Sequence, residues 1–137
     1  MNIMSDHLFC YGTLLESQIM RMVTGKEYTM QDAMLPGYSR YLVKGGDYPG
    51  VVQNPQGEAE GKLCLGVTAS DLKKLDRFEG ELYRRQLVRV KAPYNRTVNA
   101  WCYVVPRRSS MRLSKKEWSL EEYRVKILRR YNLSLEP

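Results

Sequence analysis

Leu75-Asp76-Arg77-Phe78-Glu79-Gly80 is predicted to form the last turn of an amphipathic helix whose apolar face carries a carboxylate. Leu72, Leu75 and Phe78 recur at three-residue intervals, which places them on one face of a helix with 3.6 residues per turn. Glu79 follows Leu75 by four residues and therefore lies within the same apolar stripe. Because a buried carboxylate costs free energy unless it is paired, hydrogen-bonded or used in chemistry, Glu79 is the first candidate catalytic residue.

The residues on either side predict where this helix begins and which elements come after it. Thr68 opens a capping box, and Gly80 suits a C-terminal cap. Two strands with alternating side chains are predicted at 85–91 and 97–105, and a turn at 93–95 joins them. The helix is therefore expected to lead into a β-hairpin.

The N-terminal part is predicted to run from a strand through a tight turn into a helix. Residues 8–11 are apolar and strand-like, Gly12 begins the turn, and apolar residues recur at helical spacing over 15–23. At such a junction the backbone N–H groups of the turn point outward and form a site for an anion or oxyanion. The turn Tyr11-Gly12-Thr13-Leu14 is the second candidate element of the site, and its alternative is a plain strand exit.

The middle and C-terminal parts complete the expected fold. The Gly- and Pro-rich sequence over 33–67 predicts three short strands, at 40–43, 50–52 and 61–67. Ser119 with Glu122 predicts the start of a final helix. Runs of strands with helices at the start, middle and end indicate an α+β fold with one domain over residues 1–137, built around a small, partly closed barrel.

The net charge of +7 is concentrated at the C-terminal end. Residues 107–137 contain nine Lys or Arg and four Glu, so five of the seven net charges lie in this basic, helical segment. A solvent-facing helix is the favoured interpretation. The alternative is a nucleic-acid-binding module, which ranks low because no nucleic-acid motif accompanies these basic residues: Arg107, Arg108, Lys115, Lys116, Arg129 and Arg130.

Other bulk features indicate a cytoplasmic protein. No run of about 18 apolar residues predicts a membrane span, and the first residues do not have the pattern of a secretory signal. Cys10, Cys64 and Cys102 are isolated in apolar segments, so they are expected to be reduced, buried thiols.

The sequence excludes most common catalytic machinery. His7 is the one histidine, which disfavours Ser-His-Asp and Cys-His mechanisms. No metal-ligand spacing, phosphate-binding loop or dinucleotide-binding turn is present, so no metal and no cofactor are expected. An enzyme with this sequence would therefore depend on a carboxylate, and burial would raise the pKa of Glu79 toward the range useful for proton transfer.

Each candidate has a structural alternative. Glu79 could be a buried carboxylate that pairs with Arg84 or Arg85. Asp76, at the edge of the apolar stripe, is expected to contact water or a helix end. Tyr83 and Tyr103 are expected to fill the core, with the alternative that their hydroxyls reach a polar pocket.

The sequence resembles the gamma-glutamylcyclotransferase-like superfamily, most closely the branch of small gamma-glutamylamine cyclotransferases and plant avirulence-induced proteins. The resemblance covers residues 8–105 and depends on two segments in combination, Phe9-Cys10-Tyr11-Gly12-Thr13-Leu14 and Leu75-Asp76-Arg77-Phe78-Glu79-Gly80. Further matching segments are Tyr48-Pro49-Gly50-Val51-Val52, Glu60-Gly61 and Ala100-Trp101-Cys102-Tyr103-Val104. Arg77 departs from the pattern, since an acidic residue is common there, and its helical position predicts that it points outward.

The resemblance implies a small, mixed, mostly antiparallel β-barrel flanked by helices. It also implies that Glu79 is the general acid and base, and that the loop 11–14 binds a small-molecule γ-glutamyl substrate through backbone N–H groups. The reaction would release an amine or amino acid and form 5-oxoproline. Tyr83 and Tyr103 are secondary candidates for orienting the substrate, and loop 43–57 with the C-terminal segment is expected to surround the leaving group.

The alternative function within the same fold is a non-catalytic or differently specific protein that binds a small ligand. A monomer or a homodimer is expected.

Overall fold

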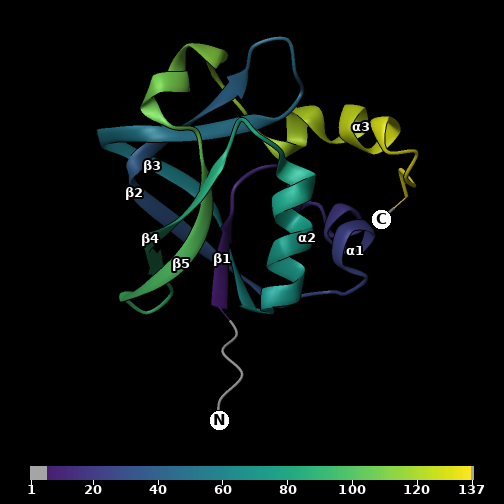
Figure 1. Cartoon of the computed structure of the whole chain (residues 1–137), viewed down its shortest axis with the longest axis horizontal. Coiled ribbons are helices and arrows are strands. Elements are labelled where there is room, and N and C mark those ends of the chain that lie inside the picture. Colours follow the sequence, from purple (N-terminus) through teal and green to yellow (C-terminus); the bar gives the residue numbers. More distant parts are fainter. Residues whose placement is uncertain (1–5, 137) are drawn as a thin grey trace.

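Five strands of the computed structural model, which describes residues 6–136, close into a β-barrel (Figure 1). They are β1 (Asp6–Cys10), β2 (Met30–Val43), β3 (Pro49–Val67), β4 (Arg84–Ala92) and β5 (Arg96–Val104). The barrel closes through the pairs β1–β3, β3–β2, β2–β4, β4–β5 and β5–β1, of which only β5–β1 is parallel. The predicted mixed, mostly antiparallel barrel is confirmed.

Three α-helices lie on one side of the barrel (Figure 1): α1 (Ser17–Thr24), α2 (Ala69–Glu79) and α3 (Leu120–Arg130). Short 3₁₀ helices, η1 (Thr13–Leu15) and η2 (Arg107–Arg112), follow β1 and β5. Arg124 of α3 binds Glu16, just before α1, with 2.9 Å between Nε and Oε2. Over residues 6–136, no helix is both long enough and apolar enough to cross a membrane.

Alternating residues of β1 and β5 contact two different hydrophobic cores. Phe9 and Cys102 lie in the core inside the barrel, whereas Leu8 and Tyr103, from the same strands, belong to the core between barrel and helices. Leu75 of α2 is fully buried in this second core. The core therefore holds α2 against the strand that leads into the turn at Gly12.

The prediction of three short strands between residues 33 and 67 is wrong. β2 and β3 are long and pair from Met30↔Cys64 to Leu42↔Pro49. Pro36 lies at a register shift in β2, next to Gly37 with φ +85°, which is the kind of irregularity that admits Pro and Gly into a strand. Asn54-Pro55 likewise lies inside β3, so these turn-like dipeptides do not end the strands.

One further strand was not predicted. β6 (Leu113–Glu117) pairs with β2 alone and is an edge strand with three exposed charged residues. A charged edge strand lacks the alternating apolar pattern by which strands are recognised, which explains why the sequence does not reveal it. The first helix also differs, since the predicted span 15–23 begins as η1 and α1 starts only at Ser17.

The predicted helix boundaries are confirmed by their caps. The Thr68 hydroxyl accepts a hydrogen bond from the Asp71 N–H at 3.1 Å, and the Ser119 hydroxyl accepts one from the Glu122 N–H at 3.3 Å. Gly80 ends α2 with φ +80°, a conformation that favours glycine. These caps fix the position of Glu79 in the last turn of α2.

The C-terminal basic segment, residues 107–137, forms ion pairs and also contributes buried apolar side chains to the core. Lys116 pairs with Glu122 at 2.7 Å and Arg130 pairs with Asp47 at 2.6 Å. Tyr123 and Ile127 of α3 are buried in the core next to the barrel. The three cysteines are free and buried, as predicted.

Replacing Leu75 by alanine should lower the free energy of unfolding by about 2–5 kcal/mol, because its side chain is fully buried in the core between the barrel and the helices. Urea denaturation followed by circular dichroism measures this change. Arg77→Ala, on the exposed face of the same helix, is the matched control and should shift the value by less than about 0.5 kcal/mol. Equal stability of the two variants would show that α2 does not depend on this contact.

Candidate active site

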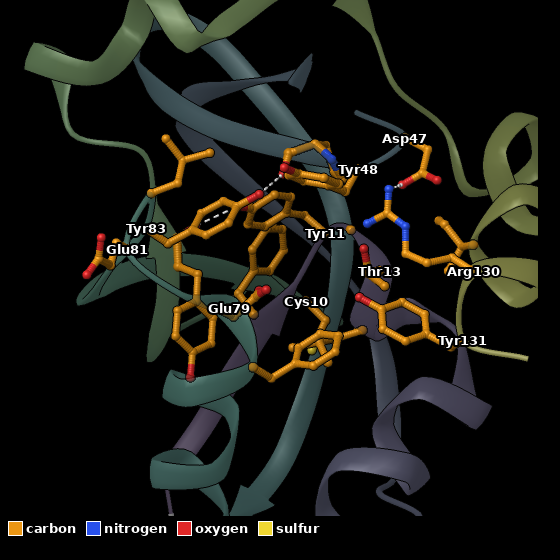
Figure 2. Close-up of a pocket in the computed structure, with 18 residues that line it drawn as sticks. Cys10, Tyr11, Thr13, Asp47, Tyr48, Glu79, Glu81, Tyr83, Arg130 and Tyr131 are labelled. Carbon is orange, nitrogen blue, oxygen red and sulfur yellow. Dashed lines mark hydrogen bonds and ion pairs between the residues drawn. The ribbon is translucent and has the colours of Figure 1, made fainter. Parts of the chain in front are cut away.

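A cavity of about 330 Å³ opens where the end of β1 meets the last turn of α2 and the end of α3 (Figure 2). Its other walls come from the loop before β3 and from the connection between α2 and β4. The cavity brings together all seven residues that the sequence predicted for the site: Tyr11, Gly12, Thr13, Leu14, Glu79, Tyr83 and Tyr103.

Glu79 points into this cavity and is half-buried (Figure 2). Among residues 6–136, its carboxylate has no ion-pair or hydrogen-bond partner. Burial without a compensating partner raises the pKa of Glu79 from 4.5 to about 8. A carboxyl group with this pKa exchanges its proton near neutral pH.

The structural alternative for Glu79, an ion pair with Arg84 or Arg85, is wrong. Arg85 binds Asp76, with 2.7 Å from Nε to Oδ1 and 3.1 Å from Nη2 to Oδ2. The Arg85 guanidinium also lies over the Trp101 ring, 4.4 Å from its centroid. Arg84 is exposed at the start of β4.

Asp76 therefore has a structural role that the sequence did not predict. Besides the bonds from Arg85, its carboxylate accepts a hydrogen bond from the Tyr103 hydroxyl at 2.8 Å. Burial disfavours the Asp76 anion, but these hydrogen bonds hold its pKa below the ordinary value. One helical turn thus carries two carboxyl groups in opposite states, an ionised Asp76 and a Glu79 that favours its proton.

The turn from Tyr11 to Leu14, which directly follows β1, forms another wall of the cavity, and it needs glycine at position 12. A Cβ atom on Gly12 would lie 2.8 Å from Cγ of Pro49, closer than such atoms approach. Backbone N–H groups of Leu15 and Glu16 donate to the Gly12 and Thr13 carbonyls at 2.9 and 3.1 Å. In the described part of the chain, the N–H groups of Gly12, Thr13 and Leu14 donate to no protein acceptor.

Arg40 holds the first peptide of this turn from outside the cavity. Its Nη1 donates to the Tyr11 carbonyl and to the Glu60 carbonyl, each at 2.9 Å. A trans peptide is planar, with its C=O and N–H pointing in opposite directions. The Gly12 N–H, which shares a peptide with the Tyr11 carbonyl, therefore points away from Arg40.

The hydroxyl groups of Tyr11, Tyr83 and Tyr103 all donate hydrogen bonds to acceptors within the protein. Tyr11 donates to the Tyr103 carbonyl at 2.5 Å, and Tyr83 donates to the Pro49 carbonyl at 2.6 Å. Burial is the main reason that the pKa of each of the three phenols is raised, so all three stay protonated. Tyr83 and Tyr103 both line the cavity, and substrate contact by either residue stays a prediction.

The lining residues that were missing from the predicted site include Asp47, Tyr48, Arg130 and Tyr131. Helical spacing could have identified two of them. Arg130 and Tyr131 follow the buried Ile127 by three and four residues, which places them on the same face of the last helix. Asp47 and Tyr48 fall within the predicted loop 43–57, of which only residues 44–48 lie between β2 and β3. The part of the chain with assigned structure contains no cluster of three His, Cys, Asp or Glu side chains that could hold a metal ion.

Comparison with known proteins shows one consistent family. The family model described as "Gamma-glutamyl cyclotransferase, AIG2-like" matches residues 8–120. Protein AIG2 C of Arabidopsis thaliana is 33% identical over 122 residues, which cover 88% of this chain and 73% of that protein. The match to AIG2-like protein A of the same plant is 34% identical but spans only 60% of this chain and 50% of that protein.

Solved structures share the fold. A solution structure from Arabidopsis thaliana superposes with a TM-score of 0.75 and 30% identity, covering 96% of this chain and 79% of that one. A structure named "Gamma-glutamyl cyclotransferase" has a TM-score of 0.63 and covers 74% of this chain and 67% of that one. Its sequence identity of 18% shows likeness of fold alone.

The raised pKa of Glu79 should make the stability of the protein depend on pH. The folded protein binds the Glu79 proton more tightly than the unfolded chain, so this contribution is complete below about pH 4.5 and is lost as the pH rises to about 8. The difference in the free energy of unfolding between the wild type and Glu79→Gln should therefore decrease as the pH rises from about 4.5 to about 8. Urea denaturation of both proteins at a series of pH values measures the difference, and a constant difference would contradict the buried, unpaired state.

Proposed function

The chain belongs to the "Gamma-glutamyl cyclotransferase, AIG2-like" family, and we propose that it cyclises the γ-glutamyl group of a small amide conjugate. The products are 5-oxoproline and the released amine or amino acid. The observation that carries this proposal is the unpaired Glu79 carboxyl, which faces the same cavity as the free N–H groups of the Gly12 turn.

The reaction needs a base that later acts as an acid. Glu79 takes a proton from the substrate α-ammonium, and the freed amine attacks the γ-carbonyl carbon to form the new C–N bond. The bond from that carbon to the amide nitrogen of the conjugate then breaks, and Glu79 returns the proton to the leaving nitrogen. The second proton lost by the α-nitrogen also ends on the released amine, which leaves as an ammonium ion. A pKa near 8 suits a group that must both accept and donate.

The turn supplies hydrogen-bond donors for the negative charge. The substrate α-carboxylate and the oxyanion that develops on the γ-carbonyl are the two anions within reach of N–H groups in this turn. Because Arg40 binds the Tyr11 carbonyl from outside, the Gly12 N–H is directed away from it, which supports a donor role toward the cavity.

The shape of the cavity supports catalysis by confinement. A volume of about 330 Å³ is at the small end of ligand pockets and suits a curled γ-glutamyl conjugate. Holding the α-amine next to the γ-carbonyl favours closure of the five-membered ring, because both reacting groups belong to one molecule.

Glu79→Gln should lower kcat by about 10²- to 10⁴-fold, since the amide cannot transfer the proton. The assay incubates the purified protein with γ-glutamyl amines and γ-glutamyl amino acids and measures 5-oxoproline. Glu81→Gln, an exposed carboxylate at the edge of the same cavity, is the matched control and should retain turnover. Intact turnover in Glu79→Gln would remove Glu79 from the mechanism, and binding without 5-oxoproline release by the wild type would indicate a ligand-binding protein.

Arg40→Met should lower kcat/KM by about tenfold, equivalent to about 1.4 kcal/mol, because the first peptide of the turn loses its anchor. Arg40→Lys keeps one charged donor and should restore part of the loss. A rise in KM would assign the turn to the α-carboxylate, whereas a fall in kcat would assign it to the oxyanion. Unchanged kinetics in a folded Arg40→Met protein would show that the turn needs no support from outside.

A further inference from the structure

One side of the cavity is built by residues outside the matched family region. The family model ends at residue 120, where α3 begins, yet Ile127, Arg130 and Tyr131 all line the cavity. In Figure 2 Arg130 and Tyr131 lie on the side away from Glu81 and Tyr83, with Asp47 next to Arg130. This wall therefore contains residues that lie beyond the region matched by the family model.

Arg130 is held in place within this wall. Its Nη2 lies 2.6 Å from Oδ1 of Asp47, and its guanidinium lies over the Tyr48 ring, 5.3 Å from the centroid. The Asp47 loop is itself fixed, because the Asp47 carbonyl accepts a hydrogen bond from Nε1 of Trp118 at 2.9 Å. A guanidinium that is already positioned loses little conformational entropy when it binds a ligand.

Arg130 differs in charge from the other ionisable residues that line the cavity. It is the one basic residue among those of the described chain that line the cavity, where the acidic residues are Asp47, Glu79 and Glu81. The Asp47 side chain is 15% exposed, and its Oδ1 atom is buried 2.6 Å from Nη2 of Arg130. The Arg130 side chain is 42% exposed and has five N–H donors, more than Asp47 uses.

We propose that Arg130 binds the carboxylate of the leaving group, so that the substrates are γ-glutamyl conjugates of amino acids rather than of simple amines. The inference rests on the proposed function. The substrate then carries two carboxylates: the α-carboxylate of the γ-glutamyl group, which is one of the two anions within reach of the Gly12 turn, and that of the departing amino acid, which contacts Arg130. Bidentate, charge-assisted hydrogen bonds between guanidinium and carboxylate supply both affinity and orientation.

Two conjugates that differ by one carboxylate test this proposal: γ-glutamyl-alanine and γ-glutamyl-ethylamine. The wild type should show a kcat/KM at least about tenfold higher for γ-glutamyl-alanine, as expected for hydrogen bonds to a charged group. Arg130→Gln should remove this preference by lowering the value for γ-glutamyl-alanine alone. Arg129→Gln, the exposed neighbour on the same helix, is the matched control and should preserve the preference.

The Arg130→Gln/Asp47→Asn double variant removes both members of the ion pair and should also lose the preference, without leaving a buried carboxylate unpaired. Equal losses for both conjugates would overturn the proposal, because Arg130 would then act on the γ-glutamyl group or on the structure of the cavity. A wild type without preference would overturn it as well.

Calorimetric binding of the two conjugates to Glu79→Gln tests the carboxylate site independently of the proposed activity. Tighter binding of γ-glutamyl-alanine than of γ-glutamyl-ethylamine, lost on adding Arg130→Gln, supports the carboxylate site even if the wild type releases no 5-oxoproline. In that case the proposed cyclisation activity is wrong, but the carboxylate-binding site at Arg130 is supported. If instead the wild type turns over both conjugates and Glu79→Gln binds them equally tightly, the cyclisation activity is supported and the carboxylate-binding site is wrong.

Discussion

The ion pair between Asp76 and Arg85 occupies the guanidinium that would otherwise be available to neutralise Glu79. The Asp76 carboxylate binds both the Arg85 guanidinium and the Tyr103 hydroxyl. Glu79, one helical turn later, therefore binds neither group. Glu79 then has only burial acting on it, and its pKa rises to about 8. Two carboxyl groups with separated pKa values on one helix are a recurrent way to obtain a proton-transfer group from ordinary residues.

The barrel places this carboxyl opposite the Gly12 turn. β1 lies between two hydrophobic cores, and the residues that face the helices hold α2 alongside the strand. The strand ends at the turn and the helix ends at Glu79, so both elements deliver their functional groups to one cavity (Figure 2). Arg40 holds the turn from outside the cavity, and Pro49, which lines the cavity, packs closely against Gly12.

Local patterns predicted the parts of the site that depend on one element alone. Glu79 follows from helical spacing and Gly12 from a strand-to-helix junction, and both lie in the cavity. The hydrogen-bond partners of Asp76 were not predictable in this way, because Asp76 on α2 and Tyr103 on β5 are far apart in the sequence and meet only in the folded protein. The long β2 and β3 strands were missed because Pro36 and Asn54 resemble loop residues while lying within paired strands. Arg130 contributes to the cavity only through the packing of α3 on the barrel.

A crystal structure of Glu79→Gln with a γ-glutamyl amino acid bound would test the central claim most directly, namely that the acid and the turn amides serve one substrate. We predict that the γ-glutamyl α-amine lies within hydrogen-bond distance of the side chain at position 79. The α-carboxylate or the γ-carbonyl oxygen should then accept hydrogen bonds from the N–H groups of residues 12–14. A ligand bound elsewhere on the molecule, or one in the cavity that contacts only one of the two elements, would contradict the account.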